Sequence, residues 1–116
     1  MTHKWIESVV EDYKERFRPY EFRLVWHSPE SFDPENAAID VRLTAQGEEY
    51  SANFVAMEFI SERFKIFKQT EECADGTFFG MRDNMLVLEK ITEQSVKTTI
   101  DYLIANKEIE SYFKKI

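Results

Sequence analysis

The chain has 116 residues, of which 43% are hydrophobic and 32% are charged, and its formal net charge is −7. This length fits one domain, residues 1–116, which can bury a sufficient core without the help of a metal or a disulfide. The acidic balance disfavours nucleic-acid binding, because an acidic surface repels the phosphate backbone.

The first quarter of the chain reads as a helix, a strand and a loop. Apolar residues recur at helical spacing over 3–17, and Arg18-Pro19 is expected to end that helix. Residues 21–27 alternate between apolar and polar side chains, which predicts a strand. The segment 28–36 holds two prolines and no periodicity, so we expect a surface loop.

A hairpin and a second helix are predicted next. Residues 38–44 and 49–55 alternate and are separated by a Gln-Gly pair, which predicts an antiparallel hairpin with one polar face. Helical spacing returns over 57–69. Phe59 and Ile66 widen the apolar stripe of this helix, which is typical of a helix that lies flat on a sheet.

The stretch 71–89 contains two of the three glycines, the only cysteine and the most apolar run of the chain. We interpret 77–81 and 85–89 as the two strands of a hairpin. Because the second strand begins with four successive apolar residues, we expect it to be central and covered on both faces. The pair in the first strand, Phe78 and Phe79, is expected to lie in the core; the alternative is that one of them is exposed beside the acids, which would suit protein recognition.

Two helices are expected at the C-terminal end. Thr92 is predicted to cap the first one, with Ile91 packed onto Val96, and Asn106 is predicted to end it in a left-handed conformation. Residues 109–116 suggest a short terminal helix. The order is α-β-β-β-α-β-β-α, followed by the short terminal helix, which predicts an α+β protein with helices packed on a mainly antiparallel five-stranded sheet.

The sequence contains no catalytic or metal-binding constellation. Cys73 is surrounded by acids and lies near a predicted helix C-terminus, and both features disfavour a reactive thiolate. The only histidines, His3 and His27, form no zinc-ligand cluster with it. No phosphate-binding glycine loop and no calcium-binding loop is present. We therefore expect no cofactor, no metal and no catalytic residue.

Acidic side chains crowd two predicted loops. The segment 28–49 carries six acids and one base, a net charge of −5. Such a surface attracts a basic protein partner, and the alternative is that solvated charges simply keep the protein soluble. The residues predicted to bind a protein partner are Glu30, Asp33, Glu35, Glu71, Glu72 and Asp75.

The cellular compartment is inferred from what the sequence lacks. A single cysteine cannot form an internal disulfide, which fits a reducing compartment. No apolar run approaches the roughly 18 residues of a membrane span, and no secretory signal is visible. We expect a cytoplasmic protein that does not contact a membrane.

The C-terminal half resembles small uncharacterised bacterial proteins. The similarity rests on Gly76-Thr77-Phe78-Phe79 after an acidic loop, on the apolar run 85–89, and on a helix that starts at Thr92. Some of these bacterial proteins are similar to immunity proteins encoded beside polymorphic toxins. The resemblance implies a cytoplasmic protein that neutralises a toxin by binding it, and it carries over no site residue.

Three interpretations of function follow. The first is a non-enzymatic, acidic binding protein with a protein partner, in its most concrete form an immunity protein. The second is a small enzyme or ligand-binding module with a pocket between sheet and helices. Its polar groups would be His27, Glu72, Asp75 and Arg82. The third is a homo-oligomer, for instance a homodimer, whose interface includes Tyr112, Phe113 and Ile116.

Overall fold

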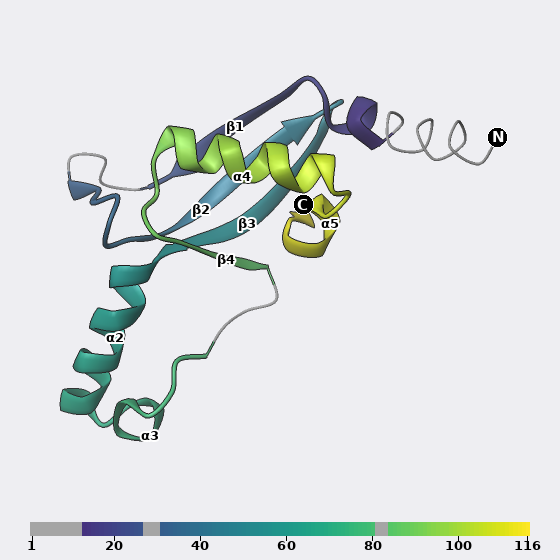
Figure 1. Cartoon of the computed structure of the whole chain (residues 1–116). Helices are drawn as coiled ribbons and strands as arrows, with labels where there is room; N and C mark the ends of the chain where they lie inside the picture. Colours follow the sequence, from purple (N-terminus) through teal and green to yellow (C-terminus); the bar gives the residue numbers. More distant parts are fainter. Residues whose placement is uncertain (1–12, 27–30, 81–83) are drawn as a thin grey trace.

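The computed structural model describes residues 13–26, 31–80 and 84–116 (Figure 1). A helical segment over 13–17 precedes three strands, which are β1 (Tyr20–Val25), β2 (Ala38–Ala45) and β3 (Glu48–Ala56). The elements that follow are α2 (Met57–Thr70), α3 (Cys73–Gly76), β4 (Met85–Leu88), α4 (Glu93–Ala105), α5 (Ile109–Tyr112) and β5 (Lys114–Lys115).

The strands form one sheet in the order β1-β2-β3-β4, and β5 pairs with β3. The pairs β1–β2, β2–β3 and β3–β5 are antiparallel, whereas β3 and β4 are parallel. Gln46 and Gly47 both have positive φ, 52° and 76°, which is the turn geometry that matches the twist of a two-residue hairpin. The predicted α+β class with a mainly antiparallel five-stranded sheet is confirmed.

The core lies between one face of this sheet and the C-terminal helices. Every second residue of β2, including Val41 and Leu43, is fully buried. Helix α4 covers this face with its own apolar residues, and α5 lies beside it (Figure 1). The opposite face is polar, as predicted. There, Asp40 accepts hydrogen bonds from Arg42 Nε at 2.8 Å and from Ser51 Oγ at 2.6 Å.

The start of α4 is set by the residues that the sequence indicated. Thr92 Oγ1 accepts a hydrogen bond from the Ser95 backbone at 3.0 Å, and Ser95 Oγ accepts one from the Thr92 backbone at 2.8 Å. Ile91 is completely buried. The predicted left-handed stop at Asn106 is wrong, because its φ is −103° and Lys107, with φ 56°, takes the left-handed conformation instead.

The predicted hairpin over 77–89 is wrong. Residues 77–80 form no strand, and Met81 lies outside the described residues. Strand β4 is an edge strand that pairs only with β3, and Val87 is 41% exposed, so β4 is not covered on both faces. The four-residue apolar run is explained by its two different surroundings, since one face packs on the core and the other points toward the base of α2.

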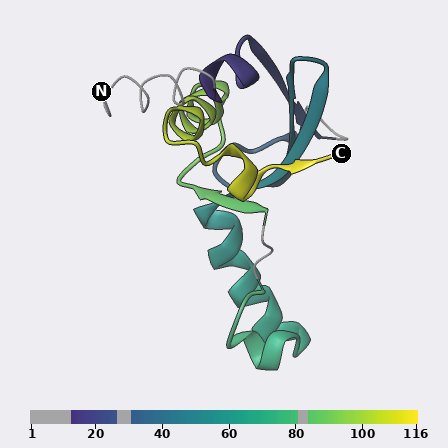
Figure 2. The same ribbon diagram turned by 90° about the vertical axis from the view of Figure 1, so that its right-hand side faces the viewer.

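Helix α2 has nearly its predicted bounds but not its predicted position. It projects away from the sheet in both views (Figures 1 and 2), and none of its residues is buried. The reason is that α4 already covers the apolar face of the sheet, whereas the other face is polar. Phe78 is 54% exposed and Phe79 is half-buried, so the expected core position of this pair is also wrong.

The C-terminus ends as a strand and not as a helix. Helix α5 ends at Tyr112, and Phe113 is extended, with φ −94° and ψ 130°. Phe113 is 1% exposed and packs at 6.0 Å from the ring of Phe54, so it contributes to the core and not to an intermolecular surface. Strand β5 supplies the fifth strand that the sequence placed at 77–81.

Candidate functional site

Residues 57–80 leave the sheet as one projection, which we call the arm; it comprises α2, α3 and the segment that returns toward β4 (Figure 2). Helix α2 follows β3 directly and has no side-chain cap. Glu58 in its first turn and Lys68 in its last turn match the helix dipole. Glu71, with φ 64°, ends the helix in the left-handed conformation and starts the reversal of the chain.

The tip of the arm is a tight reversal that depends on Gly76. Cys73, Ala74 and Asp75 all have positive φ, so α3 is not a regular helix. Gly76 has φ +74°, and a Cβ atom there would lie 2.6 Å from the Phe64 carbonyl oxygen. Glycine therefore allows the returning segment to lie directly against α2.

The arm carries eight large apolar side chains, and none of them is buried. They partly cover one another, since the rings of Phe67 and Phe79 stack at 6.2 Å. Met57 and Phe78 nevertheless remain 60% and 54% exposed. The eight large apolar side chains of the arm are those of Met57, Phe59, Ile60, Phe64, Ile66, Phe67, Phe78 and Phe79. Partly exposed apolar side chains in this number make the arm a candidate interaction surface.

One cation is embedded in this apolar surface. The guanidinium of Arg63 lies 4.7 Å from the centroid of the Phe59 ring, in a cation–π contact. Its Nε is enclosed and donates no hydrogen bond to any described residue. A buried donor without an acceptor costs free energy, so this position does not contribute to the stability of the arm through a hydrogen bond at Nε.

Three of the predicted protein-binding acids lie at the tip of the arm. Glu71, Glu72 and Asp75 are all exposed, and no ion pair joins them to a base of the described chain. The segment 69–76 contains no lysine or arginine. The tip therefore presents three exposed carboxylates that form no ion pair among the described residues, beside Lys68, whose side chain lies against Gly76.

The other predicted acids are not brought to this tip. Asp33 and Glu35 are exposed in the loop before β2, and Glu30 lies outside the described residues. The two groups of acids lie far apart in both views (Figures 1 and 2). Asp33 Oδ1 accepts a hydrogen bond from the Glu35 backbone at 3.0 Å, which gives this carboxylate a local role in the turn.

The loop before β2 supports the base of the arm. Asn36 Nδ2 donates a hydrogen bond to Glu62 on α2. The Pro34 carbonyl accepts a hydrogen bond from the Ile91 backbone at 2.7 Å, which ties the same loop to the start of α4. The loop before β2 thus contacts α2 directly and is itself tied to the start of α4, and these contacts support the direction in which α2 leaves the sheet.

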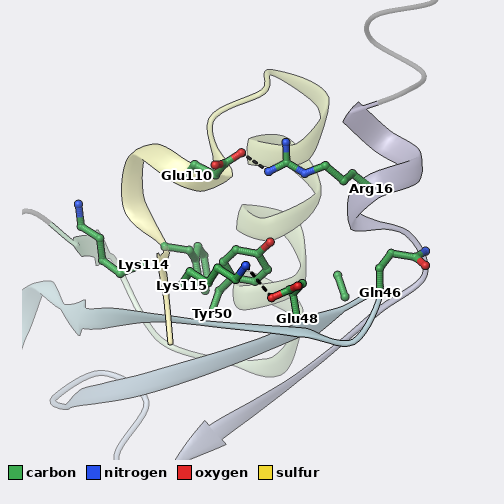
Figure 3. A pocket seen from close by; sticks show the side chains of 9 residues that line it. Arg16, Gln46, Glu48, Tyr50, Glu110, Lys114 and Lys115 are labelled. Carbon is green, nitrogen blue, oxygen red and sulfur yellow. Dashed lines mark hydrogen bonds and ion pairs between the residues drawn. The ribbon is translucent and has the colours of Figure 1, made fainter.

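A pocket of about 470 Å³ lies between the helical segment 13–17, the β2–β3 turn and the C-terminus (Figure 3). Arg16 forms an ion pair with Glu110, and Lys115 Nζ lies 2.9 Å from Glu48 Oε2. These pairs raise the pKa of both basic groups. Tyr50 lies between the two pairs (Figure 3). Four of the five charged side chains lining this pocket form these two ion pairs, whereas Lys114 forms none with a described residue, and the pairs fasten the C-terminal segment to the helical segment 13–17 and to the hairpin.

A wider groove of about 800 Å³ lies between β1 and α4. Tyr20 donates a hydrogen bond to Asp101 Oδ1 at 2.5 Å, and Lys97 donates one to Asp101 Oδ2 at 2.8 Å. Burial and the bond to Asp101 raise the pKa of Tyr20. Burial alone would raise the pKa of Asp101, but the Lys97 and Tyr20 donors lower it below its ordinary value. The side chains of Tyr20, Lys97 and Asp101 are thus hydrogen-bonded to one another, so none of the three is free to accept a proton from a ligand.

Only two of the four residues that the sequence proposed for a pocket lie in the described part of the chain. His27 and Arg82, like His3, lie outside the described residues, and Glu72 and Asp75 are exposed on the arm. Within the described ranges, no three His, Cys, Asp or Glu side chains are grouped to hold a metal ion. None of the described helices combines the length and the apolar composition needed to span a membrane.

Comparisons of the chain with protein-family models, with curated proteins and with solved structures found no significant match. The sequence pattern did not predict that the apolar side chains of α2 would stay partly exposed. The signal of that exposure was the width of the apolar stripe on α2, where Phe59 and Ile66 lie beside the central positions. An apolar stripe of this width can pack against more than one neighbour. Here the returning segment covers part of it, since Phe79 stacks on Phe67, and the rest of the stripe stays partly exposed.

Proposed function

We propose that this chain is a non-enzymatic, cytoplasmic protein-binding module whose contact element is the arm. One observation carries this proposal: eight large apolar side chains share one projection and none of them is buried. A protein of this size normally buries such residues, because each contributes about 1.5–3 kcal/mol when it leaves water. A partner that covers the arm supplies this free energy at the interface.

The arm also defines the chemistry of its partner. A half-exposed amphipathic helix fits an apolar groove, which is a common mode of recognition between proteins. The three exposed acids at the tip favour basic side chains at the end of that groove. The partner is therefore a folded protein with an apolar groove and a basic rim at one end.

The most concrete version of this function is neutralisation of a toxin. Its support is the resemblance of the C-terminal half to bacterial proteins that are similar to immunity proteins. Co-expression with the product of a neighbouring toxin gene tests this version, because growth should be rescued by the wild type and not by a variant with a damaged arm. Rescue that persists with the damaged arm would remove the arm from the mechanism.

A matched pair of isoleucine variants tests the proposed contact element. Ile66 is half-buried on the arm, whereas Ile116 is 63% exposed at the C-terminus. A partner is first recovered from native lysate and purified, and its Kd for each variant is measured by calorimetry. Ile66→Glu should weaken binding at least about 30-fold, the loss typical of an interface hot spot. Ile116→Glu should leave the Kd unchanged.

The charges at the tip require a separate measurement. Replacing Glu71, Glu72 and Asp75 by Gln, Gln and Asn should weaken binding to the same purified partner and reduce its dependence on salt. Equal affinity and equal salt dependence in the triple variant would show that the tip does not contribute. An unchanged Kd for Ile66→Glu would refute the proposal as a whole.

A further inference from the structure

Strand β1 forms the edge of the sheet that lies opposite to β4 and the arm (Figure 1). Its six residues pair with β2 in a continuous register, without a bulge, and contain no proline. An edge strand without a bulge, a proline or a covering element can accept another strand. Whether β1 does so depends on its free backbone groups, on the space beside it and on its charges.

The turn between β2 and β3 fixes the hydrogen-bond pattern of the sheet. Ala45 and Glu48 flank this two-residue turn, so they exchange both backbone hydrogen bonds. Bonded and non-bonded pairs then alternate along the hairpin, and the non-bonded pairs turn their backbone groups toward the neighbouring strands. Asn53 belongs to such a pair, and its N–H does donate to the Asn84 carbonyl of the next strand, at 2.8 Å. The observed bond confirms the alternation.

The same alternation shows which backbone groups of β1 face outward. On β2, residues 40, 42 and 44 bond toward β1, where they lie opposite residues 25, 23 and 21. The other three residues of β1 therefore direct their N–H and C=O groups away from β2, and they are Tyr20, Phe22 and Leu24. No other segment of the described chain forms a backbone hydrogen bond with these groups.

Open space adjoins this edge of the sheet. The groove of about 800 Å³ runs along residues 18–22 and is bounded on its other side by α4. On the core face, the side chains of Tyr20, Phe22 and Leu24 are only partly buried, whereas the core-facing side chains of β2 are buried. A strand added beside β1 would place apolar side chains next to these three residues, so the core face favours an occupant that is apolar at alternate positions.

The polar face of β1 selects among such strands by charge. It presents Glu21 and Arg23, two exposed side chains of opposite sign. Among the described residues, Glu21 forms no ion pair, and Arg23 pairs only with Glu49, at 3.6 Å. Like charges directly opposite each other destabilise a strand pair, whereas opposite charges stabilise it. A fitting strand therefore carries a base opposite Glu21 and an acid opposite Arg23.

Strand β1 itself has this pattern when it is read in the opposite direction. We infer that β1 pairs with β1 of a second copy of this chain, antiparallel and about a two-fold axis at Phe22. Glu21 then lies opposite Arg23 of the second copy, and Tyr20 lies opposite Leu24 of the second copy. Outward-facing residues meet outward-facing residues, so each of these three opposed pairs exchanges two backbone hydrogen bonds.

The charges select this register from its neighbours. A two-fold axis at Glu21 would place the two Glu21 side chains opposite each other, and an axis at Arg23 would do the same for the two arginines. An axis at Tyr20 or at Leu24 would leave Glu21 and Arg23 without each other and would shorten the overlap of the two strands. The axis at Phe22 alone combines the full overlap with two pairs of opposite charges.

The size of the contact fixes the expected strength of the dimer. Two six-residue strands form an interface below about 1,200 Å², which is the range of weak and transient association. We expect a dissociation constant in the micromolar range or above. The arm leaves the sheet beside the opposite edge and remains accessible in this dimer, so the protein-binding function proposed above stands or fails independently of it.

Exchange of the two charges provides the decisive experiment. Sedimentation velocity should show a concentration-dependent dimer for the wild type and monomers for Glu21→Arg and for Arg23→Glu, because like charges then lie directly opposite each other. An equimolar mixture of these two variants should form a heterodimer, and a chain that carries both substitutions should form a homodimer again. Glu72→Arg, which changes the net charge as much as Glu21→Arg does, is the control and should dimerise like the wild type.

Two results of this experiment would overturn the inference. One is a wild type that stays monomeric up to about 1 mM. The other is a failure of both the mixture and the doubly substituted chain to associate, since only the opposed charges distinguish them from the single variants. Far-UV circular dichroism confirms that each variant is folded.

Hydrogen exchange measured by NMR tests whether the edge is free in the monomer. In the Glu21→Arg variant, the amides of Tyr20, Phe22 and Leu24 should exchange faster than those of Arg23 and Val25, which bond to β2. In the wild type at a concentration that favours the dimer, the exchange of these three amides should slow. Slow exchange of the three amides in the monomer would show that another part of the chain occupies the edge, and it would also overturn the inference.

Discussion

Two isoleucine-to-alanine substitutions separate the core of the protein from its arm. Ile100 lies on α4 and is fully buried, so its replacement by alanine should lower the free energy of unfolding by about 2–5 kcal/mol. Ile66 lies on α2 and is only half-buried, so it loses less contact with water on folding. The higher helix propensity of alanine restores a few tenths of a kcal/mol, and we expect a net loss of less than about 1 kcal/mol.

Urea denaturation followed by circular dichroism measures both values. The dependence of the unfolding free energy on urea concentration should stay the same in the two variants, so that a change in midpoint reports stability alone. Binding to the partner should show the reverse order, with a larger loss for Ile66→Ala than for Ile100→Ala. If Ile66→Ala costs as much stability as Ile100→Ala, the apolar surface of the arm serves folding, and its assignment to partner binding is refuted.

Three further substitutions test particular contacts. Gly76→Ala should loosen the tip of the arm by more than about 1 kcal/mol, because φ is +74° and the new Cβ would meet the Phe64 carbonyl; hydrogen exchange should rise at the tip and remain unchanged in the sheet. Thr92→Ala should cost about 1 kcal/mol in urea denaturation through the lost cap, and Thr92→Ser should restore most of it. Asp101→Asn should remove a pH-dependent contribution. Because folding lowers the pKa of Asp101 from 3.8, this carboxylate stabilises the protein above that pH, and the difference from the variant should vanish as the pH falls through the folded pKa. A difference that persists at lower pH would contradict the assignment.

Local patterns in the sequence predicted most of the secondary structure of the body. Strict alternation over 38–44 and 49–55 specified both the strands and the polar face, because the side-chain period of a strand is two residues. The cap at Thr92 was also readable, because its partner, Ser95, lies only three residues away. In both cases the interacting groups are close in sequence, and the pattern alone places them.

The candidate site was only partly predictable. The sequence identified Glu71, Glu72 and Asp75 as candidate binding residues, and they do lie at the exposed tip of the arm. It also grouped them with the acids of the loop before β2, from which the fold separates them. The apolar surface beside them was expected to be core, because periodicity shows which side of a helix is apolar and does not show what covers that side.

In the stretch 71–89, the sequence predicted an apolar strand, and only the tertiary structure determined where that strand lies in the sheet. Its composition determined that a tight, acidic turn would be followed by an apolar strand. Whether that strand lies at the centre or at the edge depends on whether another segment pairs with its outer side. Residues 77–80 form no strand there, and the fifth strand comes instead from Lys114 and Lys115, which pair with Ser51 and Tyr50 of β3 beyond the end of β4. The physical reason is that strand pairing and the covering of a sheet face join distant segments, and α4 buries the one apolar face that α2 would otherwise have covered.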